Sequence, residues 1–260
     1  MNNVRLLSMD FDGTLVSESE HPPFPFELVD TLNLLRSAGV SLALNTGRTI
    51  ELVDHGLAVN RFPIQPDFAL TTERDLYRWN GSAWESLGDW NHVCEQRHEE
   101  LYQNSLKFLS ELEAFALNLK GTKIHRESDR FVGVITANSR QMDEFCAYVD
   151  RRRDGLPEFS YQRNSIYLRF CHLDYNKGTV LAELQRLLGF SPEETFAVGD
   201  NFNDLPMLDA KFARYVACPA NSIAEVKSAV ETQGGIVATK KCGNGVAQAL
   251  RQFFPQFFGK

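Results

Sequence analysis

Two acidic residues, separated by one phenylalanine, end the first apolar segment of the chain. Asp10 and Asp12 follow VRLLSM, and Gly13 comes directly after them. Side chains alternate along a strand, so we expect both carboxyl groups near one side of the strand end. The alternative for this pair alone is an Asx-type turn. Two like charges this close favour a bound cation, a proton held by one carboxyl group, or both.

Further polar residues stand at comparable places along the chain. Thr46 ends a second apolar segment in LALNTGR, Lys177 opens KGTVLAELQRLL, and Asp200 ends ETFAVGD. The carboxyl ends of parallel strands face a common crevice. Carboxylates from two strands suit Mg²⁺, while a threonine hydroxyl and a lysine charge suit a phosphoryl group. Together these residues predict a phosphoryl-transfer site.

The segments that carry these residues alternate between strand and helix patterns. Residues 4–9 and VSLALNTG have the pattern of buried strands, while Phe26–Ala38 and TIELVDHGLAV have helical spacing. The same alternation resumes near Asp174. This pattern predicts an α/β fold, in which a Rossmann-like parallel sheet forms the core and helices cover both of its faces.

The middle of the chain follows a different pattern. DLYRWNGSAWESL predicts a hairpin that turns at Asn80-Gly81, and a helical stretch runs from about Asn91 to Leu117. Two strand pairs and a helix over Ser139–Arg153 follow. We therefore expect a discontinuous core formed by residues 1–73 and 173–260, with an inserted α+β domain over residues 74–172.

Composition narrows the possible functions. The 260 residues carry a formal charge of -7, which is unfavourable for nucleic-acid binding. Five scattered cysteines without a CxxC pair predict a reducing compartment and no zinc site. The chain begins MNNVRLL and has no long apolar run, so we expect a cytoplasmic protein that does not bind membranes. We expect a monomer or a small homo-oligomer, with the FFPQFF tail packed on its own core or on a neighbouring subunit.

Four short motifs, in order, resemble those of the haloacid dehalogenase-like phosphatases: DFDGTL, NTGR, YNKG and GDNFND. The insert between the second and third motifs is similar to the α+β cap of the Cof-type and sucrose-phosphate phosphatase branch. PDFALTTERDLYRW also resembles that branch. However, those sequences tend to have a glycine-containing turn where this chain has Glu73-Arg74.

The resemblance implies a covalent mechanism for the reaction. Asp10 would attack phosphorus and form an aspartyl-phosphate, while Asp12 would protonate the leaving alcohol and then activate water. It also implies one set of residues that hold Mg²⁺ and another that bind the substrate. The metal ligands would be Asp10, the Asp12 backbone carbonyl, Asp200 and Asp204; the substrate would contact Gly13, Thr46, Gly47, Arg48, Lys177 and Asn203.

The predicted function is that of a Mg²⁺-dependent phosphatase acting on a small phosphorylated metabolite, with a sugar or polyol phosphate as the expected substrate. One alternative is a phosphosugar mutase of similar fold, which would reuse the phosphoryl group. Another is a catalytically silent ligand-binding protein. Asp204 also has a second interpretation, as a first-turn carboxylate favoured by a helix dipole.

Substrate contacts outside the four motifs have competing interpretations. Glu73 and Arg74 could contact a polyol or form a hinge, and His125 with Arg126 could contact the same substrate. The run Arg151–Arg153 could clamp a phosphate, but a positively charged helix end stopped by Gly155 is the simpler interpretation. Sugar stacking competes with ordinary core packing for the three tryptophans, Trp79, Trp84 and Trp90.

Overall fold

The structure is a computed structural model that describes residues 3–17, 19, 21–127 and 129–259. The chain divides into two compact units. The first, called the core unit here, contains Met1–Asn91 and Lys177–Lys260, and the second, called the inserted unit, contains His92–Asn176. The divisions therefore lie after Asn91 and after Asn176, whereas the sequence placed them at 73/74 and 172/173.

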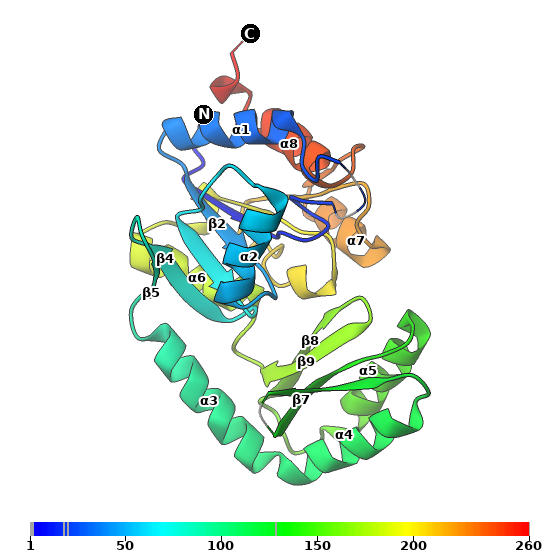
Figure 1. Ribbon diagram of the computed structural model, residues 1–260. Coiled ribbons are helices and arrows are strands. Elements are labelled where there is room, and N and C mark those ends of the chain that lie inside the picture. The colour runs from blue at the N-terminus through cyan, green and yellow to red at the C-terminus, as the bar shows by residue number, and fades with distance from the viewer. Residues whose placement is uncertain (1–2, 18, 20, 128, 260) are drawn as a thin grey trace. The chain divides into compact units, whose positions relative to one another are not determined.

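The core unit is built on one eight-stranded sheet with the order β12-β11-β10-β1-β2-β3-β4-β5. The strands from β12 to β3 pair in parallel, and β4 and β5 add an antiparallel hairpin. Figure 1 shows this sheet in the upper part of the view. The strands are β1 (Leu6–Met9), β2 (Ser41–Asn45), β3 (Phe68–Thr71), β4 (Asp75–Trp79), β5 (Trp84–Ser86), β10 (Thr195–Val198), β11 (Tyr215–Cys218) and β12 (Ile236–Val237).

Helices cover both faces of this sheet, which confirms the predicted α/β fold. Alternate residues of β1 serve the two faces, since Leu7 and Met9 belong to one apolar cluster and Leu6 to the other. The first cluster includes residues of α1 (Phe26–Ser37), α2 (Ile50–Asn60) and α8 (Cys242–Phe253). The second includes residues of α6 (Lys177–Leu188) and α7 (Ala224–Thr232). The central strands of the sheet therefore lie between two layers of helices.

The hairpin β4–β5 extends the core sheet. Its first strand pairs with β3, in a register that places Phe68 opposite Arg78. Its turn contains Asn80 and Gly81, as predicted, and Asn80 N–H donates to the Ala83 carbonyl oxygen. Leu76 is fully buried in the core unit's second apolar cluster, which attaches the hairpin to the core.

The inserted unit has its own sheet and its own apolar cluster. Its four antiparallel strands have the order β6-β7-β9-β8, and the cluster around Phe145 and Phe170 contains residues of this unit alone. This arrangement matches the predicted pattern of strand pairs and helices. The elements are α3 (Trp90–Asn104), α4 (Leu106–Asn118), β6 (Lys123–Glu127), β7 (Arg130–Ile135), α5 (Ser139–Arg152), β8 (Phe159–Asn164) and β9 (Tyr167–His172).

Three features differ from the sequence analysis. The helical stretch from Asn91 is two helices, because α3 ends at Asn104 and α4 begins at Leu106. Within the region where the strand and helix alternation resumes, the segment NDLPMLDA forms no α-helix but only the 3-10 turn Phe202–Asp204, followed by further turns. Pro206, which has no N–H to donate, disfavours a continuing helix there. No element was predicted for Cys242–Phe253, where two glycines near the start hide the helical pattern of α8.

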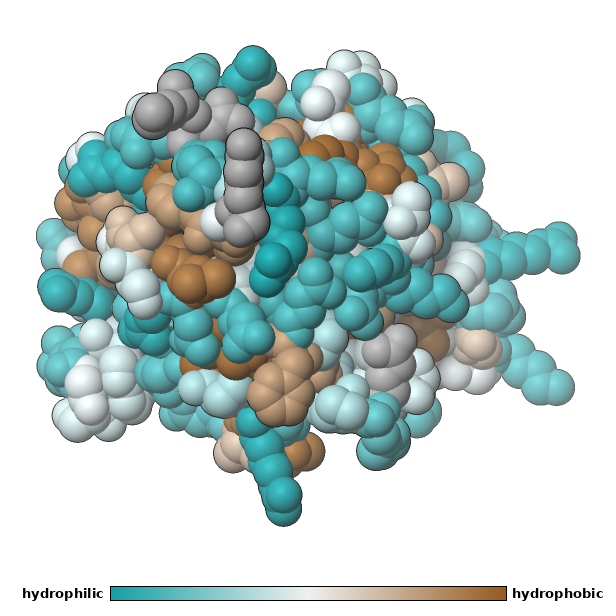
Figure 2. Space-filling view, turned by 90° about the horizontal axis from the view of Figure 1, so that it is seen from above, coloured by the Kyte–Doolittle hydropathy of each residue, from teal (hydrophilic) through white to brown (hydrophobic). Residues whose placement is uncertain are grey.

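The described part of the chain has no helix long and apolar enough to span a lipid bilayer. Figure 2 shows a largely hydrophilic face, with hydrophobic patches separated by polar side chains. The aromatic tail packs on its own core unit: Phe254 is fully buried, and Phe253, Phe257 and Phe258 lie against the same apolar cluster.

Candidate active site

Asp10 and Lys177 form a buried ion pair at the end of β1. Lys177 Nζ lies 2.7 Å from Asp10 Oδ1 and 2.6 Å from Asp204 Oδ1, and its side chain is completely buried. Asp10 stands one residue beyond β1, where its N–H donates to the Val198 carbonyl oxygen of β10. Lys177 is the first residue of α6. The lysine therefore connects the end of β1 and the turn after β10 to the start of a helix.

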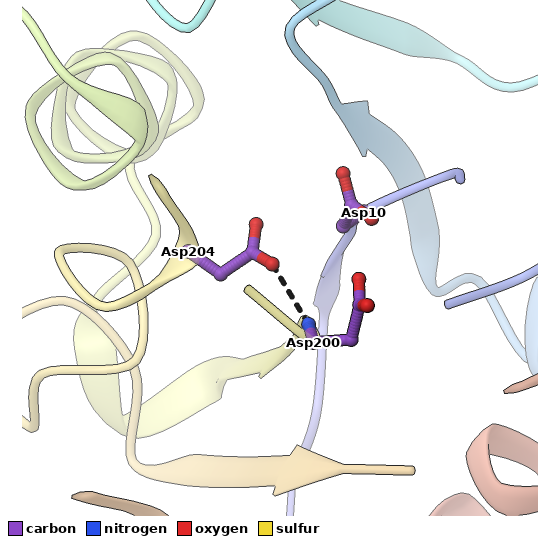
Figure 3. Close-up of side chains that lie close together, drawn as sticks. All are labelled: Asp10, Asp200 and Asp204. Carbon is purple, nitrogen blue, oxygen red and sulfur yellow. Dashed lines mark hydrogen bonds between the residues drawn. The ribbon is translucent and has the colours of Figure 1, made fainter. Parts of the chain in front are cut away.

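Three carboxyl groups converge at this point, from the ends of β1 and β10 and from the turn after β10. Asp10, Asp200 and Asp204 each offer one oxygen, and these oxygens lie within 4.8 Å of one another (Figure 3). Asp204 Oδ2 accepts hydrogen bonds from the backbone N–H groups of Asp200, at 2.7 Å, and Asn201, at 2.9 Å. Asp204 is thus held by the turn itself, while its other oxygen contacts Lys177.

Burial and mutual repulsion set the charge states of these groups. Burial is the main cause that raises the pKa of Asp10 well above its usual value, and Asp204 and Asp200 add to it while Lys177 opposes it. Burial, followed by the charge of Asp204, raises the pKa of Asp200 to about 7. Burial alone would lower the pKa of Lys177, but Asp10, Asp204 and Glu73 outweigh it and raise that pKa. A positive charge placed between the carboxylates would make their ionised forms more favourable.

The donor set fits a hard divalent cation. The three carboxyl groups, when ionised, carry three negative charges against one lysine charge, and all of them offer oxygen ligands. Mg²⁺ prefers a few carboxylate oxygens together with water and phosphate oxygens. An ion there would also favour the ionised forms of Asp10 and Asp200, whose pKa values are raised first by burial and then by repulsion from neighbouring carboxyl groups.

A glycine lets the loop after β1 approach Asp200. Gly13 has a φ of +78°, and a Cβ atom built on it would lie 2.8 Å from Asp200 Oδ2. The next residue, Thr14, donates its hydroxyl to Asp200 Oδ1 at 3.1 Å. Asn221 Nδ2 donates to the Gly13 carbonyl oxygen at 2.8 Å. Any side chain at position 13 would therefore strain the backbone and displace the Asp200 carboxyl group.

Thr46 and Gly47 lie directly after β2. Thr46 is buried, and its hydroxyl accepts a hydrogen bond from Arg48 N–H at 3.2 Å. Its O–H bond can therefore still donate to a bound oxygen. Its backbone N–H donates to the Leu70 carbonyl oxygen of β3, which fixes the strand end. A Cβ atom at Gly47 would lie 3.3 Å from Glu73 Oε1, so glycine leaves room for that carboxyl group.

Arg48 donates two hydrogen bonds to the side chain of Asp12. Its Nε lies 2.6 Å from Asp12 Oδ2, and its Nη2 lies 2.7 Å from Asp12 Oδ1. Arg48 Nη1 also donates to the Leu52 carbonyl oxygen of α2, at 3.1 Å. The guanidinium thus fixes Asp12 relative to α2. Arg48 was predicted to contact the substrate, and in the structure its guanidinium pairs with the Asp12 carboxyl group.

Asn203 and Asp204 are neighbours in the turn but have different partners. Asn203 is 2% exposed, and its Nδ2 donates to Glu73 Oε1 at 2.6 Å. Glu73 is itself buried, although it lies outside the four motifs. Its contact with Asn203 brings it beside the predicted site residues.

Some residues that shape the site were not among those predicted from the sequence. Asn45 is buried at the end of β2, and its Nδ2 donates to Ser8 Oγ, at 3.1 Å, and to the Lys177 carbonyl oxygen, at 2.9 Å. Thr14 and Asn221 hold Asp200 and the Gly13 loop, as described above. Thr14 lies inside DFDGTL and could have been noticed, but a buried Asn that bonds backbone atoms far away in sequence has no local pattern.

The other candidate site residues named from the sequence form contacts within their own unit. Within the inserted unit, Arg152 pairs with Glu111 at 3.1 Å and Arg153 with Asp150 at 3.4 Å, while His125 contacts the Tyr167 hydroxyl and Arg126 pairs with Glu113. In the core unit, the rings of Trp79 and Trp84 pack edge to face. Trp90 Nε1 donates to the Arg74 carbonyl oxygen. These contacts support structural roles for the three tryptophans and the arginine run.

Comparisons with known proteins agree with this geometry. The haloacid dehalogenase-like hydrolase family matches residues 62–250. A phosphoglycolate phosphatase of Methanoculleus marisnigri is 27% identical, over 99% of this chain and 100% of its own.

Two solved structures share the fold. A sucrose-phosphatase from Synechocystis sp. PCC6803, in complex with sucrose and phosphate, has a TM-score of 0.71 and 19% identity, covering 96% of this chain and 98% of its own. A haloacid dehalogenase-like hydrolase from Bacillus subtilis has a TM-score of 0.66 and 15% identity, covering 96% and 92%. Because the family match covers well over half of the chain, this protein is an enzyme that belongs to the haloacid dehalogenase-like hydrolases.

Proposed function

We propose that this enzyme is a Mg²⁺-dependent phosphatase that hydrolyses a small phosphorylated metabolite. One observation supports this most directly: buried Lys177 bridges Asp10 and Asp204, next to the Asp200 carboxyl group. A carboxylate held beside a fixed positive charge is suited to attack phosphorus, where negative charge must be stabilised.

The first half of the reaction uses Asp10 and Asp12. An Asp10 oxygen forms a bond to phosphorus as the bond to the leaving oxygen breaks, and Asp12 gives that oxygen a proton. In the second half, Asp12 removes a proton from water, which attacks the aspartyl-phosphate and releases inorganic phosphate. In the structure, Arg48 holds the Asp12 carboxyl group in one orientation. Thr46 and Lys177 hold the phosphoryl oxygens, with Gly13, Gly47 and Asn203 beside them.

The metal ligands would be the carboxyl groups of Asp10, Asp200 and Asp204, together with the backbone carbonyl of Asp12. A bound Mg²⁺ would neutralise charge on the phosphoryl group and on the nearby carboxylates. The hydrogen bonds from the backbone N–H groups of Asp200 and Asn201 keep the Asp204 carboxyl group in place for this purpose.

The insert and the relatives support the substrate class that we propose. We propose that the inserted unit acts as a cap, which favours small metabolites over phosphoproteins. Relatives and structural neighbours named for phosphoglycolate and for sucrose phosphate support a small phosphate ester. Within this class, we propose a sugar or polyol phosphate as the substrate.

The test is release of inorganic phosphate from phosphoglycolate, sucrose phosphate, other sugar and polyol phosphates, and p-nitrophenyl phosphate, with Mg²⁺ and with EDTA. We expect release that requires Mg²⁺ and that falls by roughly 10³-fold or more in Asp10→Asn. Release that needs a sugar bisphosphate activator would indicate the mutase. A folded wild type that releases nothing, and that Asp10→Asn leaves unchanged in every assay, would indicate a silent binding protein.

A further inference from the structure

The turn between β3 and β4 has a backbone conformation that is unfavourable for the residue types found there. Thr72 and Glu73 both have positive φ, 49° and 65°, and Arg74 N–H donates to the Thr71 carbonyl oxygen at 2.9 Å. Consecutive left-handed residues in a hairpin turn strongly favour Asn-Gly. A β-branched threonine and a glutamate are therefore strained there, and such strain persists only where surrounding contacts hold it.

Those contacts connect the turn to the second motif. Thr72 N–H donates to the Arg48 carbonyl oxygen at 2.8 Å, and Glu73 N–H donates to the Thr46 carbonyl oxygen at 3.1 Å. Thr72 Oγ1 also donates to Asp75 Oδ2 at 2.5 Å. The turn thus lies directly against the backbone that carries Thr46, Gly47 and Arg48.

The Glu73 side chain continues from this turn into the site. Its carboxyl group is buried, packs beside Gly47 and accepts the Asn203 amide hydrogen bond at 2.6 Å. Its negative charge is also one of three that raise the pKa of Lys177, together with Asp10 and Asp204. One side chain therefore acts on residues of the second, third and fourth motifs.

The contact with Glu73 decides how the Asn203 amide is oriented. A carboxylate only accepts hydrogen bonds, so the NH₂ end of the amide must face Glu73. The opposite end, Asn203 Oδ1, is buried and has no hydrogen-bond partner among the described residues. An orphaned buried acceptor is unfavourable unless a bound group satisfies it, so this oxygen is ready to accept a hydrogen bond from a substrate hydroxyl or from water.

We propose that Glu73 is a positioning residue of the phosphoryl site, which holds the Asn203 amide in one orientation and buttresses the segment from Thr46 to Arg48. This proposal rests on the proposed function. It also explains why the turn lacks the sequence that its backbone favours, since Asn-Gly at positions 72 and 73 would carry no carboxyl group long enough to contact Asn203.

The test compares three substitutions at Glu73, using p-nitrophenyl phosphate and the best natural substrate. Glu73→Ala should lower kcat about tenfold or more with little change in KM, because positioning acts on the transition state. Glu73→Gln can still accept the Asn203 hydrogen bond, so it should keep at least about a third of wild-type kcat. Glu73→Gly should be as slow as Glu73→Ala but unfold at a higher temperature, because glycine tolerates positive φ.

The matched control is Glu85→Ala in the same hairpin, where exposed Glu85 accepts the Asn80 amide hydrogen bond, also at 2.6 Å. It should leave kcat unchanged. The proposal is overturned if Glu73→Ala keeps wild-type kcat, if Glu73→Gln is as slow as Glu73→Ala, or if Glu73→Gly restores kcat.

A second readout does not depend on activity. The side-chain amide signals of Asn203 in an ¹⁵N–¹H spectrum, assigned through their loss in Asn203→Asp, should shift in Glu73→Ala and stay unmoved in Glu85→Ala. Unshifted signals would overturn the positioning role. If wild type releases no phosphate from any probe, the proposed function fails, while the amide signals still decide whether Glu73 fixes Asn203.

Discussion

Lys177 shows how individual residues at this site depend on one another. It is completely buried, and its carboxylate partners Asp10 and Asp204 belong to other segments of the chain. Removing one partner of a buried ion pair leaves an uncompensated charge, which costs about 3–5 kcal/mol in typical proteins. The lysine therefore contributes to folding, in addition to the phosphoryl binding proposed for it, and a bound cation would reduce the repulsion among the carboxyl groups.

That repulsion leads to a prediction for Asp200→Asn. The pKa of Asp200 is raised to about 7, so between about pH 4 and 7 the folded protein holds a proton that the unfolded chain has lost. The free energy of unfolding of the metal-free protein should therefore fall as pH rises through this range. At pH 8 without metal, Asp200→Asn should unfold a few degrees above wild type, with little difference at pH 4.

The same variant tests metal binding by differential scanning fluorimetry. Mg²⁺ at pH 8 should raise the unfolding temperature of wild type, because a ligand that binds only the folded state stabilises it. Asp200→Asn should lose this response, whereas Asp89→Asn, a change at an exposed carboxyl group, should keep it. A full Mg²⁺ response in Asp200→Asn would contradict its role as a ligand.

Arg48→Lys tests whether the two hydrogen bonds from Arg48 position the Asp12 carboxyl group. Lysine keeps the charge but cannot form two parallel hydrogen bonds to one carboxyl group. We expect kcat to fall about tenfold, because Asp12 loses its fixed orientation, while the fold is retained. Steady-state kinetics and circular dichroism would measure this. The control is Arg36→Lys. Arg36 lies in α1 and pairs with Asp67 at 2.7 Å, outside the site. Equal kcat values for the two variants would argue against the positioning of Asp12.

Residue spacing predicted much of the site. Asp10, Lys177 and Asp200 lie together as their places at element ends suggested, and Asp204, which the family resemblance added, lies with them, while their catalytic roles stay predictions. The residues that hold them, Asn45 and Asn221, bond to backbone atoms of distant segments. Such contacts depend on how elements pack, so a single sequence carries no local sign of them.

At the scale of elements, the start of α6 is fixed by a side chain from β2. Asn45→Ala removes the hydrogen bonds to Ser8 Oγ and to the Lys177 carbonyl oxygen, and leaves that carbonyl without this donor. We expect a loss of about 1–3 kcal/mol in the free energy of unfolding. Because Lys177 opens this helix, kcat should fall as well.

Urea unfolding and steady-state kinetics of Asn45→Ala check both parts. Asn33→Ala, an exposed change in α1, serves as the control and should leave both quantities unchanged. If Asn45→Ala were destabilised but had wild-type kcat, the position of Lys177 would not depend on Asn45.

Hydrophobic periodicity predicted helices and strands well where the burial of apolar side chains dominates. Fully buried strands such as β1 and β10 are short apolar runs, and α6 has a clear apolar face. It failed where local signals conflict, as in the 3-10 turn Phe202–Asp204 and in α8. The assignment of the hairpin β4–β5 to the core unit depends on the pairing of β4 with β3, which no pattern within the hairpin reveals.

At the scale of the whole molecule, the two units have separate apolar cores. The cluster of the inserted unit contains only residues between Leu101 and Phe170. We therefore expect a fragment of residues 92–176 to fold alone, with mixed helix and strand content by circular dichroism and one cooperative unfolding transition. Replacing buried Phe145 by Ala should abolish or strongly weaken that transition. A fragment that is unfolded in water would contradict independent folding.

The core unit is interrupted by the inserted unit, and this order has a consequence during biosynthesis. Strand β1 emerges from the ribosome early, but its neighbour β10 is made only after the entire insert. Since domains fold as they are synthesised, the insert can fold while one edge of β1 still lacks its partner. A nascent chain that stops before residue 195 therefore exposes an apolar strand edge, which is the kind of surface that chaperones bind and that aggregates when left uncovered.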